Sequence, residues 1–345
     1  MSLKTIEWKN NKLVMIDQTK LPNELVYVEY SDYHQVANAI KTLVVRGAPA
    51  IGVSGAFGMA LAAINNDAKT KEELIDHLEK AHKTLLETRP TAVNLAWALD
   101  KMMLIVKEHN DVSEIKKSIV DAAQKMAEDD VKTNMKMGQN GSTLFEENDT
   151  IMTHCNAGAL ATVAYGTALG VIRATKESGK KIKVIATETR PVQQGSRLTA
   201  FELKHDGIDV DLIPDTAVGY TMANGLVNKV IVGADRILRT GHVFNKIGTY
   251  QIATMAKQHD IPFFVAAPLS TFDLKSNPED VIIEQRKASE VTTIGDKKTA
   301  PDGVGVINPA FDMTPPELIT GIITEAGVAN PPYEESIKKL FEANK

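Results

Sequence analysis

The chain holds a single cysteine, and that cysteine directly follows a short apolar run. Ile151–His154 precedes Cys155, and a second apolar run, Val230–Ala234, ends at Asp235. Both runs have the composition of buried strands in a parallel sheet. Ligands of open α/β sheets bind beyond the carboxyl ends of such strands. The pattern therefore predicts a thiol and a carboxylate that face one crevice, and this pair is the strongest chemical signal in the sequence.

The composition narrows the class of protein. The 345 residues are 43% hydrophobic and 24% charged, which is typical of a soluble globular protein long enough for two domains. A net charge of −5 without a long basic run argues against nucleic acid as a partner. One cysteine excludes internal disulfides and a cysteine-based zinc site. The N-terminus lacks a signal-peptide core, and the apolar stretch 51–64 is too short and glycine-rich to cross a bilayer. We therefore expect a cytoplasmic protein with no membrane partner.

Residues 1–149 are expected to form a small, mostly helical domain that opens with a short antiparallel hairpin. Gly52, Gly55 and Gly58 recur every three residues, which on a helix leaves a bare stripe where another backbone can approach. This is not the glycine pattern of a nucleotide-binding loop. The expected elements include strands Lys12–Ile16 and Leu25–Tyr30 and an amphipathic helix over Thr70–Leu86.

The sequence changes character near residue 150, where β-branched apolar runs begin to alternate with helical stretches. Such alternation is typical of βαβ units and a parallel sheet. We therefore expect residues 150–345 to form a Rossmann-like catalytic domain, which makes the chain an α/β protein. The expected strands are Ile151–Thr153, Ile182–Ala186, Val210–Ile213, Val230–Val232 and Pro262–Ala266, and the expected helices are Ala159–Ser178, Ser196–Lys204, Ala217–Asn224, Ile247–His259 and one that opens at Thr314–Glu317.

Further polar residues follow these strands or interrupt the helices. Lys246, at an expected helix start, combines a cation with free backbone N–H groups, a combination that suits a phosphate. Arg46 and Arg89 each lie in a helix break, from which an arginine can reach across a domain crevice and hold phosphate with two hydrogen bonds. Gln194 and Asn245 also lie beyond strands. Together these residues suit a small, polar, anionic substrate.

Each residue also has a purely structural interpretation. A free cysteine is often only a small buried apolar residue, and Asp235 is also placed to cap a helix. Arg46 and Arg89 fit surface ion pairs equally well, and Gln194 fits an ordinary turn. His154 adjoins the thiol, but neighbouring strand residues point to opposite faces, so we assign it no catalytic role. From the residues alone, the interpretation ends at an α/β enzyme for a small phosphorylated substrate.

Longer motifs carry the interpretation further. In chain order they are Val45–Gly52, Arg89–Leu95, Cys155–Gly158, Glu188–Pro191, Gln194–Ala200, Gly233–Ile237, Asn245–Tyr250 and Asn308–Asp312. With this series the sequence closely resembles the methylthioribose-1-phosphate isomerases of methionine salvage, from about Trp8 to Gly327. That family is related in fold to the regulatory subunits of translation initiation factor 2B, which bind and regulate without this chemistry.

The resemblance implies an aldose–ketose isomerase that converts 5-methylthioribose 1-phosphate to 5-methylthioribulose 1-phosphate. The phosphate locks C1 of this substrate in an acetal, so the ring must open while the phosphate stays attached. Asp235 matches the family's proton donor to the ring oxygen, a role that needs an apolar setting to raise the carboxyl pKa. Cys155 matches the second catalytic residue, which takes the C2 proton as a thiolate or assists a hydride shift.

The resemblance further implies a homodimer, a site without metal or organic cofactor, and a set of substrate-binding positions. The positions that match are Arg46, Gly47, Ala48, Arg89, Gln194, Asn245 and Lys246.

The loop Leu238–Phe244 departs from the family pattern, because Phe244 replaces a small residue directly before Asn245. Neutral drift explains this, and so does a narrower pocket for the 5-substituent of the sugar. A narrower pocket suits 5-deoxyribose 1-phosphate, the substrate of a paralogous branch. The alternative of another class is a regulatory subunit that binds a sugar phosphate or nucleotide without turnover.

Overall fold

The computed structural model describes residues 3–90 and 92–343, and the chain divides into two compact units. Unit 1 comprises Met1–Lys136 and Ala157–Gly170, and unit 2 comprises Met137–Asn156 and Val171–Lys345. The expected domain division between residues 149 and 150 stays a prediction. Thr91, part of the Arg89–Leu95 motif, lies outside the described residues.

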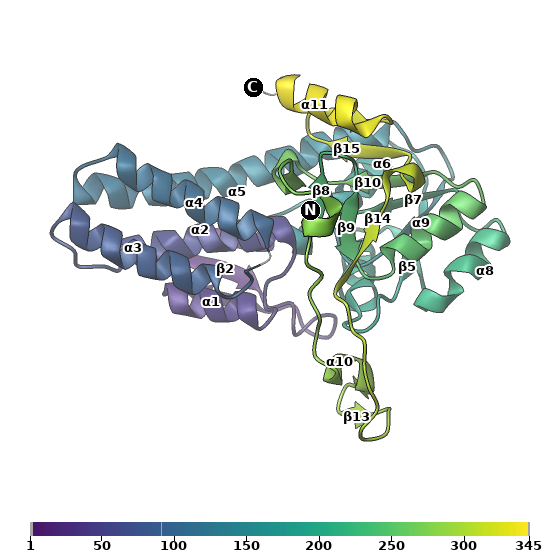
Figure 1. Ribbon diagram of the computed structural model, residues 1–345, viewed down its shortest axis with the longest axis horizontal. Coiled ribbons are helices and arrows are strands. Elements are labelled where there is room, and N and C mark those ends of the chain that lie inside the picture. The colour runs from purple at the N-terminus through teal and green to yellow at the C-terminus, as the bar shows by residue number, and fades with distance from the viewer. Residues whose placement is uncertain (1–2, 91, 344–345) are drawn as a thin grey trace. The chain divides into compact units, whose positions relative to one another are not determined.

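Unit 1 combines a three-stranded antiparallel sheet with long helices (Figure 1). The expected hairpin is incomplete, because β1 adds a third strand beside β2. The alternation in β1 is weak, since only Ile6 is fully buried, and Asn10 and Asn11 turn the chain with positive φ angles of 52° and 57°. The elements are β1 (Ile6–Lys9), β2 (Lys12–Ile16), β3 (Tyr27–Tyr30), α1 (Tyr33–Lys41), α2 (Ala48–Ile64), α3 (Lys71–Leu86), α4 (Val93–Glu108) and α5 (Val112–Ser142), which continues into unit 2.

Helix α2 is buried along nearly its whole length and carries the expected glycine stripe. A Cβ on Gly52 would lie 2.9 Å from the backbone oxygen of Asn94, and one on Gly55 would lie 2.5 Å from the Leu95 side chain. Asn94 and Leu95 both belong to α4, so the predicted close approach is confirmed. Although α2 is strongly apolar, no helix among the described residues has the length and apolarity needed to cross a membrane.

Unit 2 is built on a seven-stranded sheet in the order β16-β15-β10-β7-β4-β5-β6. All neighbours pair in parallel except β15 and β16, so the predicted parallel sheet is confirmed but has one antiparallel edge strand. Continuous burial of β4, β7 and β10 explains why these strands are plain in the sequence. The strands are β4 (Thr150–Thr153), β5 (Lys183–Thr187), β6 (Asp209–Ile213), β7 (Lys229–Val232), β10 (Phe263–Ala266), β15 (Gly321–Thr324) and β16 (Gly327–Ala329), and the main helices are α6 (Ala168–Glu177), α7 (Ala200–His205), α8 (Val218–Ala223), α9 (Thr249–Gln258) and α11 (Tyr333–Ala343).

A second sheet, in the order β11-β8-β9-β14, follows β7 in the chain and is absent from the sequence prediction. The helix expected at Thr314–Glu317 is wrong: Thr314 ends β14 opposite Val243, and Pro316–Leu318 forms only a 3₁₀ turn. Pairing with distant β9 overrides the local capping signal there. The strands are β8 (Arg236–Leu238), β9 (Val243–Lys246), β11 (Phe272–Asp273) and β14 (Phe311–Thr314).

The helix expected over Ala159–Ser178 is also wrong in its first half, because α6 begins at Ala168. The preceding residues form a loop in unit 1 that is closed by a bridge between Gly158 and Gly166. A Cβ on Gly166, where φ is 89°, would lie 2.4 Å from the Gly158 backbone. The carboxylate of Asp130 accepts a hydrogen bond of 2.8 Å from the Val163 N–H within the same unit. These contacts favour a loop over a helix.

Candidate active site

Strand β4, the first strand of the seven-stranded sheet in chain order, marks a topological switch point. β5 and β6 follow β4 on one side, whereas β7 and then β10 lie on the other. Met152 of β4 pairs with Val230 of β7, so both strands end at the same edge of the sheet. Cys155 comes two residues after β4, and Asp235 comes three residues after β7. Open α/β sheets bind ligands at this position, between diverging strand ends.

Two hydrogen-bond contacts connect the segments that follow β4 and β7, both through β9 and the turn after it. The backbone N–H of Asp235 donates a hydrogen bond of 2.9 Å to the oxygen of Phe244 in β9. Just beyond β9, the backbone oxygen of Ile247 lies 2.8 Å from Nε2 of His154, the residue before Cys155. The predicted site residues that these contacts bring together are Cys155, Asp235, Asn245 and Lys246.

Cys155 lies in a turn that hydrogen bonds hold from both sides. Its backbone N–H donates to Oγ1 of Thr189 at 2.9 Å, and its backbone oxygen accepts from Oγ1 of Thr199 at 2.5 Å. Cys155 has a φ of 59°, and Thr189 and Gln193 are also left-handed, at 65° and 60°. Left-handed residues other than glycine cost free energy and concentrate at functional sites. Three of them together beyond β4 and β5 point to a functional site.

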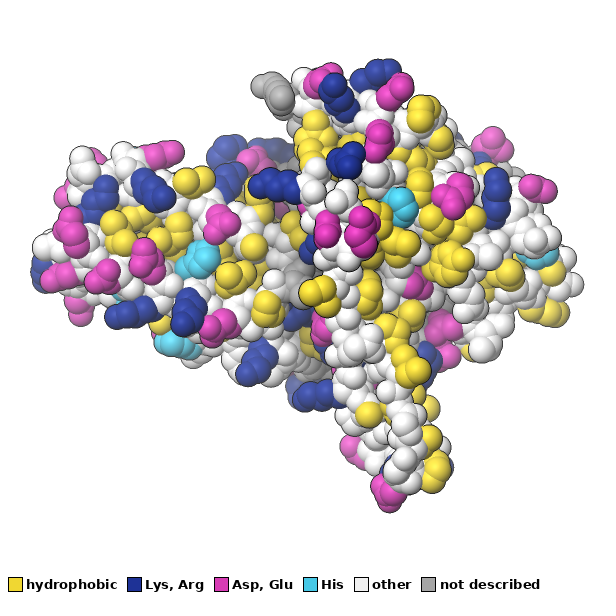
Figure 2. Space-filling view, in the orientation of Figure 1, with side chains coloured by type: hydrophobic (Ala, Val, Ile, Leu, Met, Phe, Trp, Pro, Cys, Tyr) yellow, Lys and Arg dark blue, Asp and Glu magenta, His cyan; other side chains and the backbone are white. Residues whose placement is uncertain are grey.

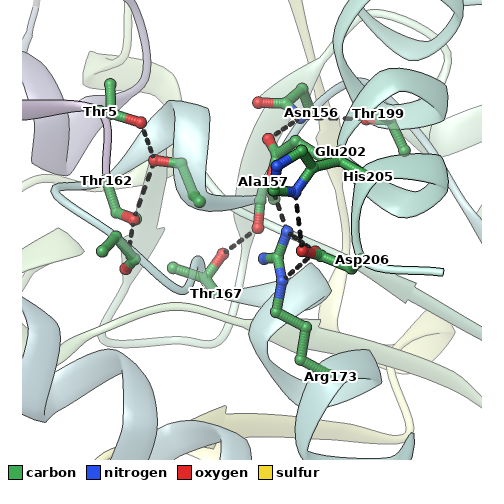
Figure 3. A network of polar contacts seen from close by, with 12 residues as sticks. Thr5, Asn156, Ala157, Thr162, Thr167, Arg173, Thr199, Glu202, His205 and Asp206 are labelled. Carbon is green, nitrogen blue, oxygen red and sulfur yellow. Dashed lines mark hydrogen bonds and ion pairs between the residues drawn. The ribbon is translucent and has the colours of Figure 1, made fainter. Parts of the chain in front are cut away.

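A buried polar network contacts Asn156, the residue that follows Cys155 in this turn (Figure 3). The Asn156 amide donates to Glu202 at 2.8 Å, and Arg173 donates to the other oxygen of Glu202 at 2.7 Å. Arg173 also donates to Asp206 at 2.6 Å. Glu202 is fully buried and Arg173 is 4% exposed. Because Asn156 follows Cys155 directly, this network fixes the chain where it leaves the thiol.

Gln194 lies in the segment that follows β5 and is 8% exposed. Its side-chain oxygen is buried and has no hydrogen-bond partner among residues 3–90 and 92–343. A buried acceptor without a partner costs free energy. The backbone of the next residue packs closely against β5, because a Cβ on Gly195 would lie only 1.7 Å from the oxygen of Thr187. Gln194 is therefore held beside the end of β5, next to the strand that leads to Cys155.

Lys246 does not lie at a helix start, as the sequence predicted, but ends β9. Its ammonium donates to the backbone oxygen of Ala310 at 2.9 Å and lies 4.6 Å from the centre of the Phe311 ring. The first N–H groups of α9 are not free, because Asp312 accepts hydrogen bonds from Gly248 at 2.7 Å and from Tyr250 at 3.1 Å.

Asp312 contacts the turn that follows Lys246, and the sequence did not single it out, although the Asn308–Asp312 motif contains it. Burial raises the pKa of Asp312 to about 6, while the N–H groups of Gly248 and Tyr250 and the ammonium of Lys246 act in the opposite direction. Thr189 and Thr199 were missed as well. Their hydroxyls act on the Cys155 backbone, and no spacing in the sequence signals such contacts.

Four of the predicted residues belong to unit 1, and their part in substrate binding stays a prediction: Arg46, Gly47, Ala48 and Arg89. Gly47 has a φ of 95°, and a Cβ there would lie 2.5 Å from the backbone of Ala161, so only glycine fits before α2. In the part of the chain that the structure describes, no group of three or more His, Cys, Asp or Glu residues is arranged to hold a metal ion.

Comparison with known proteins identifies the family. A model of the Initiation factor 2 subunit family matches residues 44–331. Methylthioribose-1-phosphate isomerase of Fervidobacterium nodosum is 53% identical over 99% of each chain. The chain belongs to this isomerase family. The resemblance stated from the motifs is thus confirmed.

Two solved structures share the fold over nearly the whole chain. One is 5-methylthioribose 1-phosphate isomerase from Pyrococcus horikoshii, with a TM-score of 0.92 and 48% identity over 99% of this chain and 96% of that one. The other is named translation initiation factor eIF-2B, subunit delta, from A. fulgidus, with a TM-score of 0.90 and 51% identity over 99% and 100%.

The network below Cys155 generates a prediction about stability. Glu202→Ala leaves the Arg173 guanidinium buried with one partner fewer, so we expect it to lower the free energy of unfolding by about 3–5 kcal/mol. Asp211→Ala is the matched control, because it breaks an ion pair with Lys183 in which both side chains are exposed, and it should cost about 1 kcal/mol or less. Urea denaturation measures both. Equal losses would contradict a structural role for the network.

Proposed function

We propose that this protein isomerises 5-methylthioribose 1-phosphate to 5-methylthioribulose 1-phosphate, a step of methionine salvage. The observation that carries the proposal is the set of hydrogen-bond contacts that connects the ends of β4 and β7 through β9. It supports a thiol and a carboxylate acting on one small substrate. Relatives that are 53% identical over 99% of the chain carry this isomerase name.

Asp235 is proposed to open the ring. As the bond between C1 and the ring oxygen breaks, its electron pair goes to the oxygen, which takes the proton of the Asp235 carboxyl group. C1 is left as a phosphate-bearing oxocarbenium centre. The backbone of Asp235 is tied to Phe244, so the acid is held on the framework that also carries Asn245 and Lys246. Such fixed placement is what general acid catalysis needs.

Cys155 is proposed to act on the hydrogen at C2. In one route its thiolate removes the C2 proton to give an enol phosphate, and C1 is then protonated. In the other route the hydrogen moves from C2 to C1 as a hydride. In both routes the C2 hydroxyl loses its proton, C2 becomes a carbonyl carbon and the phosphate stays on O1. The two hydrogen bonds to the Cys155 backbone support a fixed thiol in either case.

Substrate binding is proposed for Gln194, Asn245 and Lys246 and, from unit 1, for Arg46, Gly47, Ala48 and Arg89. The unpartnered oxygen of Gln194 supports this directly, since a sugar hydroxyl would supply the missing donor. Lys246 contributes a cation for the phosphate. A cytoplasmic location and the absence of nucleic acid partners remain parts of the proposal.

The catalytic assignment is tested by two substitutions. Cys155→Ser and Asp235→Asn should each lower kcat by about 10²–10⁴-fold, because each removes a group that moves a proton or hydrogen, with little change in substrate affinity. Asp209→Asn, at the exposed amino end of β6, is the control and should keep the wild-type rate. The measurement is steady-state turnover of methylthioribose 1-phosphate. A near-normal rate in either variant would remove that residue from the mechanism, and binding without turnover in the wild type would favour a regulatory subunit.

Substrate preference is tested with Phe244, which lies on the same face of β9 as Lys246 because the two are two residues apart. We expect the wild type to prefer methylthioribose 1-phosphate over 5-deoxyribose 1-phosphate. Phe244→Ala should raise this preference by about tenfold, since a hydrophobic pocket discriminates by ~1–3 kcal/mol per methylene-sized group. The ratio of kcat/KM values decides. A wild type that strongly favours the deoxy sugar would replace the named substrate by that of the paralogous branch.

The protein is also proposed to form a homodimer. One segment of unit 2 carries α10 (Ser289–Thr292) and β13 (Lys297–Lys298) (Figure 1). It exposes apolar side chains (Figure 2). Ile282 is 85% exposed and Ile307 is 90% exposed. Exposed apolar side chains on one segment are typical of protein interaction sites, and here they support contact with a second copy.

Sedimentation should therefore give a dimer for the wild type and a monomer for the double variant Ile282→Asp, Ile307→Asp, because charges at the interface would be desolvated. Tyr220→Asp, at an exposed position of α8, is the control and should stay dimeric. A monomeric wild type would contradict the proposal, and a dimeric double variant would exclude this segment as the interface.

A further inference from the structure

His154 is deeply buried, and both of its ring nitrogens are engaged. It is 2% exposed. Nδ1 lies 2.6 Å from Oγ1 of Thr187, and Nε2 lies 2.8 Å from the backbone oxygen of Ile247. One contact is to the end of β5 and the other to the turn after β9. The reaction steps proposed above assign no role to the imidazole itself.

The chemistry of the partners fixes the position of each proton. The oxygen of Ile247 only accepts, so Nε2 of His154 carries the hydrogen. Burial lowers the pKa of His154, which favours the neutral ring, so Nδ1 has a lone pair. The Thr187 hydroxyl must therefore donate to Nδ1. No other assignment satisfies the neutral ring and the carbonyl together.

The chain of hydrogen bonds extends to the thiol residue. Having donated to His154, the Thr187 hydroxyl can accept from Oγ1 of Thr189, 3.3 Å away. Thr189 in turn accepts the N–H of Cys155 at 2.9 Å. The Thr189 hydroxyl has the backbone oxygen of Thr187 as a second acceptor, also at 3.3 Å. Both acceptors belong to Thr187, so the series connects the backbone of Cys155 to the ring of His154.

The series also continues on the other side of the ring. The peptide group whose oxygen accepts from His154 bears the N–H of Gly248, which donates to Asp312 at 2.7 Å. Gly248 has a φ of 103°, and a Cβ there would lie 3.1 Å from Cε1 of His154. The imidazole therefore packs directly under the turn that follows Lys246.

We propose that His154 is a positioning residue of the isomerase site, whose neutral ring fixes the Lys246–Gly248 turn relative to the turn that carries Cys155. The proposal rests on the proposed function, because it assumes that Cys155 and Lys246 act on one substrate. His154 does not touch the substrate. It acts by keeping the ammonium of Lys246 beside the phosphate position. That position is the one that the phosphate occupies when the sugar lies within reach of the Cys155 thiol.

Three substitutions separate the two ring contacts. In His154→Gln the longer amide can place an N–H near the position of Nε2 and keep the bond to Ile247. In His154→Asn the shorter amide can reach Thr187 but not Ile247. In His154→Phe both bonds are lost while the ring volume is kept. Turnover of methylthioribose 1-phosphate and calorimetric binding of inorganic phosphate are measured for each.

We expect His154→Phe and His154→Asn to lower kcat/KM by about 10–100-fold, since a displacement near 1 Å at an active site costs up to about 10²-fold. The larger part should appear in KM, because the Lys246 turn is the freed element. His154→Gln should recover most of the loss. Phosphate affinity should follow the same order. Nitrogen-15 NMR of the wild-type ring should show the proton on Nε2.

Several results would overturn the proposal. Equal values for the Gln and Asn variants would show that the Ile247 bond does not matter. A loss confined to the fraction of folded enzyme, with KM unchanged, would show a purely structural role. If the wild type turns over no pentose phosphate, the proposed function fails, but the phosphate affinities of the same four proteins still decide whether His154 positions Lys246.

Discussion

The parallel pairing of β4 with β7 is the constraint on which the site depends. Because the chain lays β5 and β6 on one side of β4 and β7 on the other, the segments that follow β4 and β7 diverge at their carboxyl ends. Neither segment continues the seven-stranded sheet there. Cys155 and Asp235 lie in these segments, beyond the last residues of β4 and β7. Catalytic potential in this fold is therefore a consequence of strand order.

The segments that follow β4 and β7 are not held by the seven-stranded sheet. Hydrogen bonds from surrounding polar groups fix their conformation instead. Threonine hydroxyls hold the backbone of Cys155 in a left-handed conformation that it would not adopt by itself. Below it, Asn156 is fixed by the Glu202–Arg173 pair. A buried ion pair is a weak source of net stability, because desolvation opposes the Coulomb attraction. The role of the pair here is to orient a side chain: Arg173 holds one oxygen of Glu202, and the other oxygen accepts the Asn156 amide.

The parts of the fold that could be predicted are those whose signal is local. The central strands are continuous apolar runs, and the glycine stripe of α2 repeats regularly, so both are plain in the sequence. The second sheet could not be predicted, because its strands are two to four residues long and β14 pairs with β9 some 65 positions earlier. The setting of Lys246 was missed for the same reason: Asp312, which occupies the helix N-terminus, arrives with β14.

The alternation of side chains along a strand does not extend to His154 and Cys155. Alternation along a strand places neighbouring side chains on opposite faces, and on that ground His154 was given no part beside Cys155. However, β4 ends at Thr153, and Cys155 has a φ of 59°, so the two residues lie in a turn to which the two-residue period does not apply. The His154 imidazole contacts Thr187 and the oxygen of Ile247, so it connects the end of β5 to the turn after β9.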